Sequence, residues 1–232
     1  MKALSVGSKG PIPNCGFHWG NLEAMFPLYD LNRLPIRPVV VYSLILLNFL
    51  AFIYTYFLTD PAQVLSAYAF VPSRFFADPS GQWATLFTSM FLHGSIAHIL
   101  GNMWFLWIFG DNVEARMGHG RFLVFYLLGG VIAAFFQGLI GGDAPMIGAS
   151  GAISAVLGAY IVLFPRALIF SLVGFFPLPV PALIYLGYWA LLQLWQSAGG
   201  VPGIAFWAHI GGFIGGALLV RFFIVPQRYR RP

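Results

Sequence analysis

The sequence predicts an all-α membrane protein, built as a bundle of six membrane-spanning helices. Only 8% of its 232 residues are charged, whereas soluble globular domains have about 25%. Hydrophobic residues make up 59% of the chain, and they recur in long apolar segments from about Pro38 to Val225. We therefore expect one integral membrane domain over 25–225. A disordered tail or extension (1–24) precedes it, and a basic cytoplasmic tail (226–232) follows it.

The apolar segments are long enough for helices that cross a bilayer, because about 20 helical residues span the hydrocarbon core. In chain order, the six candidates are 38–58, 84–109, 121–140, 150–164, 182–198 and 202–224. A further apolar segment, 167–181, contains Pro177, Pro179 and Pro181, which remove backbone donors. This segment is expected to lie against the cytoplasmic side of the bundle rather than to span the membrane.

The fourth helix is short, because 150–164 extends only about 22 Å at a helical rise of about 1.5 Å per residue. The preceding stretch, 141–149, must then enter the protein as non-helical, re-entrant backbone. Such backbone is tolerated at membrane depth only where it is buried in protein or lines a wet cavity. The sequence therefore predicts a cavity next to Ser150, at the positive end of the fourth helix's dipole.

Basic residues predict the orientation of the bundle, since Lys and Arg favour cytoplasmic loops. With six spans, eleven of the twelve basic residues fall on the side of the termini, and only Arg74 falls on the other side. Both termini are therefore expected in the cytoplasm, with the protein in the cell (inner) membrane. The net charge of +5 is explained by membrane-anchoring residues rather than by nucleic-acid binding, and the oligomeric state is left open.

Cofactor chemistry is not indicated by the sequence. Cys15 is the single cysteine, so it has no partner for an intrachain disulfide or for a metal site. No metal and no other cofactor is expected.

Five polar residues, His98, Asn102, Ser150, Ser154 and His209, fall inside the apolar segments, where polar groups are costly and need a reason. Measured from the charged residue at the cytoplasmic end of each span, His98 lies about 20 Å up, Ser150 about 24 Å and His209 about 18 Å. Three helices thus bring Ser and His to one level in the outward half of the bilayer. Other intramembrane amides, Asn48, Gln137, Gln193 and Gln196, are isolated, and an interhelical hydrogen bond is sufficient to explain each.

Small residues predict close contact between the fourth and sixth helices. Gly151, Ser154, Ala155 and Gly158 form one row, while Ala208, Gly212 and Gly216 repeat at intervals of four. This is the small-xxx-small pattern of close helix packing in membranes. It would allow a serine hydroxyl on one helix to reach an imidazole on the other. His98 and Asn102 share one helix face, whereas His93 is expected to point elsewhere and to be structural.

The motifs in this order resemble the rhomboid family of intramembrane serine proteases over about residues 28–224. They are GASG from Gly148 to Gly151, AHIGGFIGG from Ala208 to Gly216, HGSIAHILGN from His93 to Asn102, and EARMGHG from Glu114 to Gly120. The resemblance implies that Ser150 is the nucleophile and His209 the general base, without a carboxylate. It further implies an oxyanion hole formed by His98, Asn102 and the Ser150 backbone N–H, and transmembrane segments of other proteins as substrates.

Two positions depart from the pattern of many relatives. Trp83-Ala84 stands where Trp-Arg is common, which puts the usual arginine contacts of the loop over 59–83 in doubt. Ser154 replaces an aromatic residue that packs against the histidine in some relatives, so His209 is expected to be held by other contacts.

Two non-enzymatic hypotheses compete with the protease. A transporter would suit a broken helix and a polar site at membrane depth, but no paired repeats are found. An inactive rhomboid-like protein that binds transmembrane helices would normally lack the Ser or the His, and both are present.

Overall fold

The computed structural model of the chain describes residues 25–32, 34, 36–199 and 204–225. The predictions made for the terminal segments, 1–24 and 226–232, lie outside this part of the chain. Residues 202 and 203 at the start of the sixth predicted span lie outside it as well.

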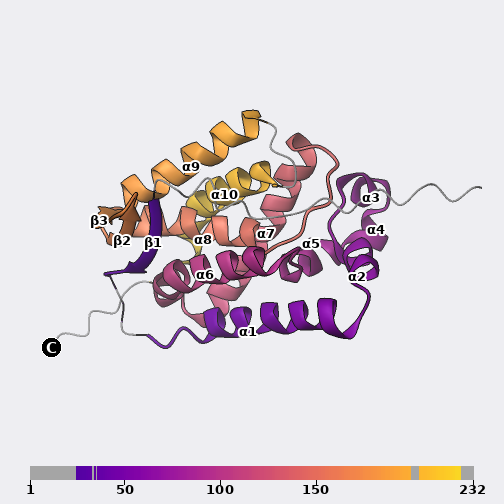
Figure 1. The fold of residues 1–232 in the computed structure, drawn as a ribbon, viewed down its shortest axis with the longest axis horizontal. Helices are drawn as coiled ribbons and strands as arrows, with labels where there is room; N and C mark the ends of the chain where they lie inside the picture. The colour runs from indigo at the N-terminus through magenta and orange to yellow at the C-terminus, as the bar shows by residue number, and fades with distance from the viewer. Residues whose placement is uncertain (1–24, 33, 35, 200–203, 226–232) are drawn as a thin grey trace, which may run out of the picture.

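Six long helices form the bundle in the described part of the chain (Figure 1). They are α1 (Val39–Ile53), which continues as a π-helical turn, η2 (Tyr54–Leu58); α6 (Ile96–Met117); α7 (His119–Ile140); α8 (Ser150–Leu163); α9 (Ala182–Gly199); and α10 (Phe206–Phe223). Helices α1 and α9 lie at opposite edges, with α6, α8 and α10 between them. Apolar residues at nearly every position explain why the central helix α8 is buried from Gly151 to Tyr160.

The second predicted helix, 84–109, is wrong at its start, because α6 begins only at Ile96. Ser95 is the N-cap of α6, and its hydroxyl accepts a hydrogen bond from the His98 amide at 3.1 Å. A serine in extended conformation is among the most favourable N-caps, so the helix begins here despite the apolar sequence before it. The preceding residues form separate short helices, α5 (Thr85–Thr88) and η3 (Ser89–Phe91).

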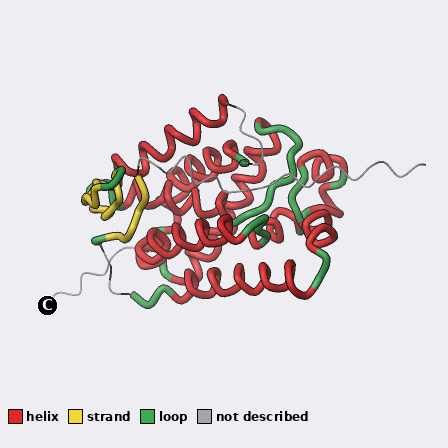
Figure 2. Tube along the Cα trace, in the orientation of Figure 1, coloured by secondary structure: helices red, strands yellow, loops and turns green. Residues whose placement is uncertain are grey.

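A small three-stranded antiparallel sheet adds to the mostly helical bundle that the sequence predicts. It consists of β1 (Met25–Asp30), β2 (Leu168–Val173) and β3 (Phe176–Pro181), in the order β1-β2-β3. The segment 167–181 is therefore a hairpin and not helical, and it lies between α8 and α9 at one end of the bundle, as Figure 2 shows in yellow.

The prolines of β3 fit the edge of this sheet. Pro177, Pro179 and Pro181 pair with Leu172, Phe170 and Leu168 of β2. They occupy alternate positions, so their missing N–H groups all fall on the side away from β2, where no strand needs a donor. The turn between the strands uses Gly174 at φ 59°, a conformation that glycine adopts without a steric penalty.

Three helical segments in the described part are long and apolar enough to cross a membrane: Val39–Leu58, His119–Ile140 and Phe206–Phe223. The shorter α8 is also apolar. These segments make the chain a multi-pass membrane protein, while the count of six spans remains a prediction.

The opposite end of the bundle from the sheet holds four short helices and the connection between α7 and α8 (Figures 1 and 2). The short helices are α2 (Pro61–Tyr68), α3 (Pro72–Ala77), α4 (Pro79–Gln82) and α5. Of these, α2, α3 and α4 lie within the predicted loop over 59–83, while α5 follows it. If the sheet end faces the cytoplasm, as the distribution of basic residues predicts, these helices lie at the outer surface.

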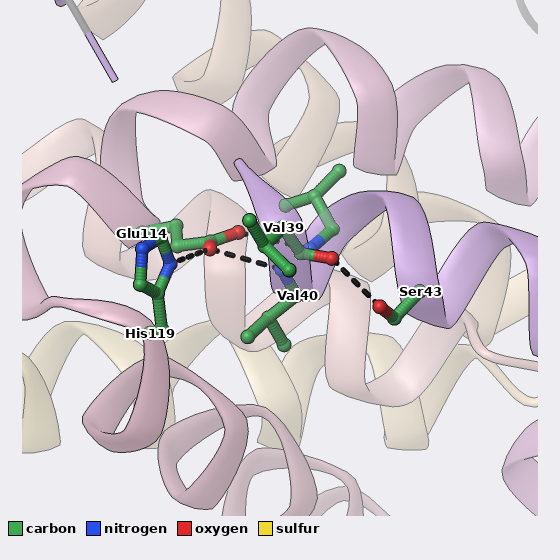
Figure 3. A network of polar contacts seen from close by, with 6 residues as sticks. Val39, Val40, Ser43, Glu114 and His119 are labelled. Carbon is green, nitrogen blue, oxygen red and sulfur yellow. Dashed lines mark hydrogen bonds and ion pairs between the residues drawn. The ribbon is translucent and has the colours of Figure 1, made fainter. Parts of the chain in front are cut away.

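A buried carboxylate fixes the beginning of α1 (Figure 3). Glu114, on α6, is fully buried, and its two oxygens accept hydrogen bonds from the backbone amides of Val40 at 3.0 Å and Val41 at 2.9 Å. These amides belong to the first turn of α1, where backbone donors have no partner within the helix. The same carboxylate pairs with His119 Nδ1. Glu114 therefore joins the beginning of α1 to the end of α6.

Helices α8 and α10 approach until their backbones touch. A Cβ atom built on Gly158 would lie 2.0 Å from the Phe213 carbonyl oxygen, and one built on Gly216 would lie 2.0 Å from the Ala155 oxygen. One built on Gly212 would lie 2.2 Å from the Gly151 oxygen. The predicted contact between these two helices is therefore confirmed, and only glycine fits at these positions.

Candidate active site

Ser150 and His209 meet where α8 and α10 both begin. Ser150 is the first residue of α8, and His209 lies in the first turn of α10. His209 Nε2 lies 2.8 Å from Ser150 Oγ, which is within hydrogen-bond distance. The close approach of the two helices produces this contact, because both residues lie within one turn of the Gly151–Gly212 crossing.

A cavity opens beside the serine, between α6, α8, α9 and α10. Polar side chains lie at Ser150, Ser154, Asn102, Gln193, Gln196 and His209, and the remaining walls are apolar or aromatic, with Gly101, Phe105, Ile153, Leu157, Trp189, Leu192, Ile204 and Phe206. A mainly apolar cavity with a few convergent polar groups is the usual form of a ligand or substrate site.

Residues 141–149, which connect α7 to α8, enter the protein as non-helical backbone, as the short length of α8 requires. Met146, Gly148 and Ala149 are buried. Met146 pairs with Phe70 through backbone hydrogen bonds of 2.8 and 3.1 Å, and Gly148 donates to the Ser89 carbonyl at 2.9 Å. This segment is thus fixed against the loop between α1 and α6.

Asp143, in the same connection, forms a hydrogen bond to the loop between α1 and α6. Its carboxylate accepts a 2.6 Å hydrogen bond from the Ser73 amide in the first turn of α3. Hydrogen bonds from the Ser73 side chain and backbone hold the pKa of the Asp143 carboxyl below its ordinary value.

Two hydrogen-bond donors on α6, from His98 and Asn102, lie close to Gly148, two residues before Ser150. The buried Nδ2 of Asn102 has no hydrogen-bond partner among the described residues. A Cβ atom on Gly148, at φ 115°, would lie 2.7 Å from His98 Nε2 and 3.5 Å from Asn102 Nδ2. Since the Gly94 amide faces His98 Nδ1 at 3.4 Å, the ring proton belongs on Nε2. Glycine at 148 therefore leaves room for two donors beside the first residue of α8.

The Ser150 backbone N–H belongs to the same group by helix geometry. The first four N–H groups of an α-helix have no acceptor within the helix, and they carry the positive end of its dipole. His98, Asn102 and this N–H are thus three hydrogen-bond donors close to the start of α8.

His93 corrects one expectation. The expectation that His93 points away from His98 assumed that both lie on one helix, but His93 precedes α6. Its ring lies 5.0 Å from the ring of His98 at an interplanar angle of 69°. His93 is 1% exposed. It is a packing partner of His98 and not a residue on a separate face.

Gln193 forms the interhelical hydrogen bond expected of it, but with His209, so it belongs to this site rather than being an isolated amide. Its Oε1 lies 2.7 Å from His209 Nδ1. Trp189, one turn earlier on α9, places its ring 6.2 Å from the His209 ring, and the Phe206 ring lies 6.4 Å from it. These contacts take the place of an aromatic residue at 154, where Ser154 instead donates to the Ser150 carbonyl at 2.7 Å. The spacing of four between Trp189 and Gln193 was the available signal, since it places both on one helix face.

The other three intramembrane amides, Gln137, Asn48 and Gln196, make different contacts. Gln137, on α7, accepts from the Ala208 amide of α10 at 3.1 Å, as an interhelical hydrogen bond requires. Asn48 donates within its own helix, to Leu44 at 2.8 Å, so that expectation was wrong. Gln196 lines the cavity.

Comparison with known proteins gives a consistent set of relatives. The sequence model of the Rhomboid domain family matches residues 80–226. The chain is 36% identical to the rhomboid protease GluP of Bacillus subtilis over 138 residues, which cover 59% of this chain and 25% of that protein. It is 35% identical over 140 residues to the mitochondrial presenilin-associated rhomboid-like protein A of Danio rerio, covering 59% of this chain and 35% of that protein.

A third relative is the mitochondrial rhomboid protein 1 of Saccharomyces cerevisiae. It is 30% identical over 158 residues, which cover 62% of this chain and 43% of that protein. The chain thus spans less than half the length of each of these relatives.

Proposed function

Because this chain belongs to the rhomboid family, we propose that it is an intramembrane serine endopeptidase that cleaves transmembrane segments of other membrane proteins with a Ser150–His209 dyad. The observation that carries the proposal is the 2.8 Å contact between Ser150 Oγ and His209 Nε2 beside a cavity within the helix bundle. A serine is a weak nucleophile unless an adjacent base removes its proton, and His209 Nε2 lies where such a base is needed.

The first step follows from the positions of the groups. Ser150 Oγ attacks the carbonyl carbon of the scissile peptide bond, and its proton moves to His209 Nε2. The carbonyl oxygen becomes an oxyanion, which His98, Asn102 and the Ser150 N–H stabilise as donors. Preorganised donors of this kind are usually the largest contribution to catalysis of acyl transfer.

Two further transfers complete the reaction. His209 returns its proton to the leaving amine as the C–N bond breaks, which leaves the acyl group on Ser150. A water molecule then attacks the ester, and His209 takes its proton. When the acyl C–O bond to Ser150 breaks, His209 returns this proton to Ser150 Oγ, and the carboxylic acid product is released. Water must reach the cavity for this step, and the polar lining at Ser154, Gln193 and Gln196 is suited to admit it.

The substrate class follows from the location of the site. A cavity between helices of a multi-pass membrane protein is accessible to a transmembrane segment of another protein from the bilayer. Such a segment must unwind near the site, because a peptide bond inside a helix is shielded by hydrogen bonding and side chains. We propose that the chain lies in the cell membrane with both termini in the cytoplasm and cuts near the outward end of the substrate, without a cofactor.

The proposal is tested by reconstituting the purified protein in nanodiscs with a panel of single-span proteins and mapping cut sites by mass spectrometry. Wild type should cut at defined bonds, and Ser150→Ala and His209→Ala should not, with thermal stability little changed. Ser43→Ala is the matched control, since Ser43 only donates to its own helix at Val39. Retention of the panel without any cut would favour a non-enzymatic helix binder, and cutting by Ser150→Ala at the same bond would refute the dyad.

A further inference from the structure

We infer that Gln193 is a positioning residue of the dyad, whose carbonyl oxygen holds His209 in the tautomer that can accept the Ser150 proton. The inference rests on the proposed function of Ser150 and His209. It goes beyond a two-residue dyad by assigning the orientation of the base to a residue on a third helix, α9.

The two ring nitrogens of His209 have different neighbours. Nδ1 lies 2.7 Å from Gln193 Oε1, and Nε2 lies 2.8 Å from Ser150 Oγ. An amide oxygen can only accept a hydrogen bond, so Nδ1 must carry the proton. In a neutral imidazole the lone pair is then on Nε2, directed at the serine hydroxyl. The opposite tautomer would donate to Ser150 and could not take its proton.

A neutral acceptor suits the surroundings of this site. A buried carboxylate without a cationic partner would be costly at membrane depth, whereas an amide orients the ring without adding a charge. No carboxylate hydrogen-bonds to His209 among the described residues of the chain. Gln193 therefore supplies the geometric part of the role that an Asp plays in a triad, namely the choice of tautomer and ring orientation.

The rest of α9 does not fix Gln193 by burial. The buried residues of α9 are Ala182, Tyr185 and Leu186, all near the sheet. Leu194 and Trp195, beside Gln193, are 49% and 80% exposed. Trp189 packs its ring on His209 and Phe213, whereas Gln193 is only half-buried. The 2.7 Å hydrogen bond to His209 is thus the specific polar contact that Gln193 adds to this packing.

The decisive measurement reads the tautomer directly. Protein labelled with ¹⁵N-histidine and held in nanodiscs gives few ring signals, because the chain has five histidines, and His209→Ala assigns the relevant pair. Wild type and Gln193→Glu should show the proton on Nδ1, and Gln193→Leu should lose this preference. Gln63→Leu, an exposed glutamine on α2, is the matched control and should leave the spectrum unchanged. An unchanged His209 tautomer in Gln193→Leu overturns the inference.

Cleavage kinetics give the second readout. Gln193→Leu should lower kcat about 2- to 10-fold, the loss expected for one net hydrogen bond, with KM and melting temperature unchanged. Gln193→Glu should restore most of kcat. It should also move the acid limb of the pH–rate profile to higher pH, since a carboxylate stabilises the imidazolium.

The two proposals fail in different ways. If wild type cuts and Gln193→Leu cuts equally fast, the role of Gln193 is refuted and the protease stands. If wild type cuts no substrate, the proposed function fails, while the tautomer measurement still decides whether Gln193 orients His209.

Discussion

Replacing Gly212 with alanine should separate Ser150 from His209 by more than a hydrogen bond can span. The added Cβ would lie 2.2 Å from the Gly151 carbonyl oxygen, whereas ordinary contact begins at about 3.4 Å. The obstacle is backbone, so it cannot rotate away, and α10 must move from α8 by about 1.2 Å. The Oγ–Nε2 distance of 2.8 Å would then grow to about 4 Å, beyond the roughly 3.2 Å limit of a good hydrogen bond.

This displacement sets the size of the expected effect. A misplacement of about 1 Å at a reacting centre can cost about 100-fold in rate, and overpacking of a close contact typically costs about 1–3 kcal/mol of stability. We therefore expect Gly212→Ala to lower kcat/KM about 100-fold with a modest fall in melting temperature, and Gly212→Leu to abolish cleavage.

The assay is cleavage of a single-span substrate in proteoliposomes, with membrane insertion and thermal unfolding measured on the same preparations. Gly187→Ala, on α9, is the matched control because nothing lies within 4 Å of the added Cβ. It should cut at the wild-type rate. Full activity of Gly212→Ala in a correctly inserted protein would show that the α8–α10 contact does not determine the dyad.

The remaining predictions concern the oxyanion donors and the orientation in the membrane. His98→Ala and Asn102→Ala should each lower kcat by about 10²–10³, with near-normal capture of a transmembrane substrate by pull-down. His93→Ala should lower the melting temperature and weaken catalysis only through the His98 ring that it supports; a large loss of kcat at full stability would contradict this. A reporter fused after Pro232 should be cytoplasmic and one inserted near Asp143 external, and the reverse labelling would rule out the orientation taken from the basic residues.

The positions of the helices could be predicted because they depend on local properties of the sequence. Long apolar runs predict helices in a membrane, since only internal hydrogen bonding satisfies the backbone there. Five of the six predicted segments begin or end within a few residues of the observed helices, α1, α7, α8, α9 and α10. The start of α6 was missed because one polar cap, Ser95, overrides the apolar character of the residues before it.

The sheet could not be predicted from local patterns. Met25 pairs with Val173, and Asp30 with Ile169, so each strand of this pair completes its hydrogen bonds with residues from a distant part of the chain. The alternating prolines of β3 argued against a helix, but they could not identify the partner strand. Strand pairing over such a separation is decided only when the bundle brings the beginning of α1 and the end of α8 to the same end.

The sequence alone predicted one common level for Ser150, His98 and His209, because helical rise converts residue number into height. The structure brings Ser150 and His209 into contact and places His98 beside Gly148. Small residues at intervals of four likewise predicted which helices touch. Rotation of α9 about its axis, however, has only a weak signal in the sequence, the spacing of four between Trp189 and Gln193. Tertiary packing therefore decided that α9 turns Gln193 toward His209 Nδ1 and that the His93 ring packs edge-on against His98. Those contacts depend on side chains from separate helices, whose mutual orientation is fixed only by the packing of the whole bundle.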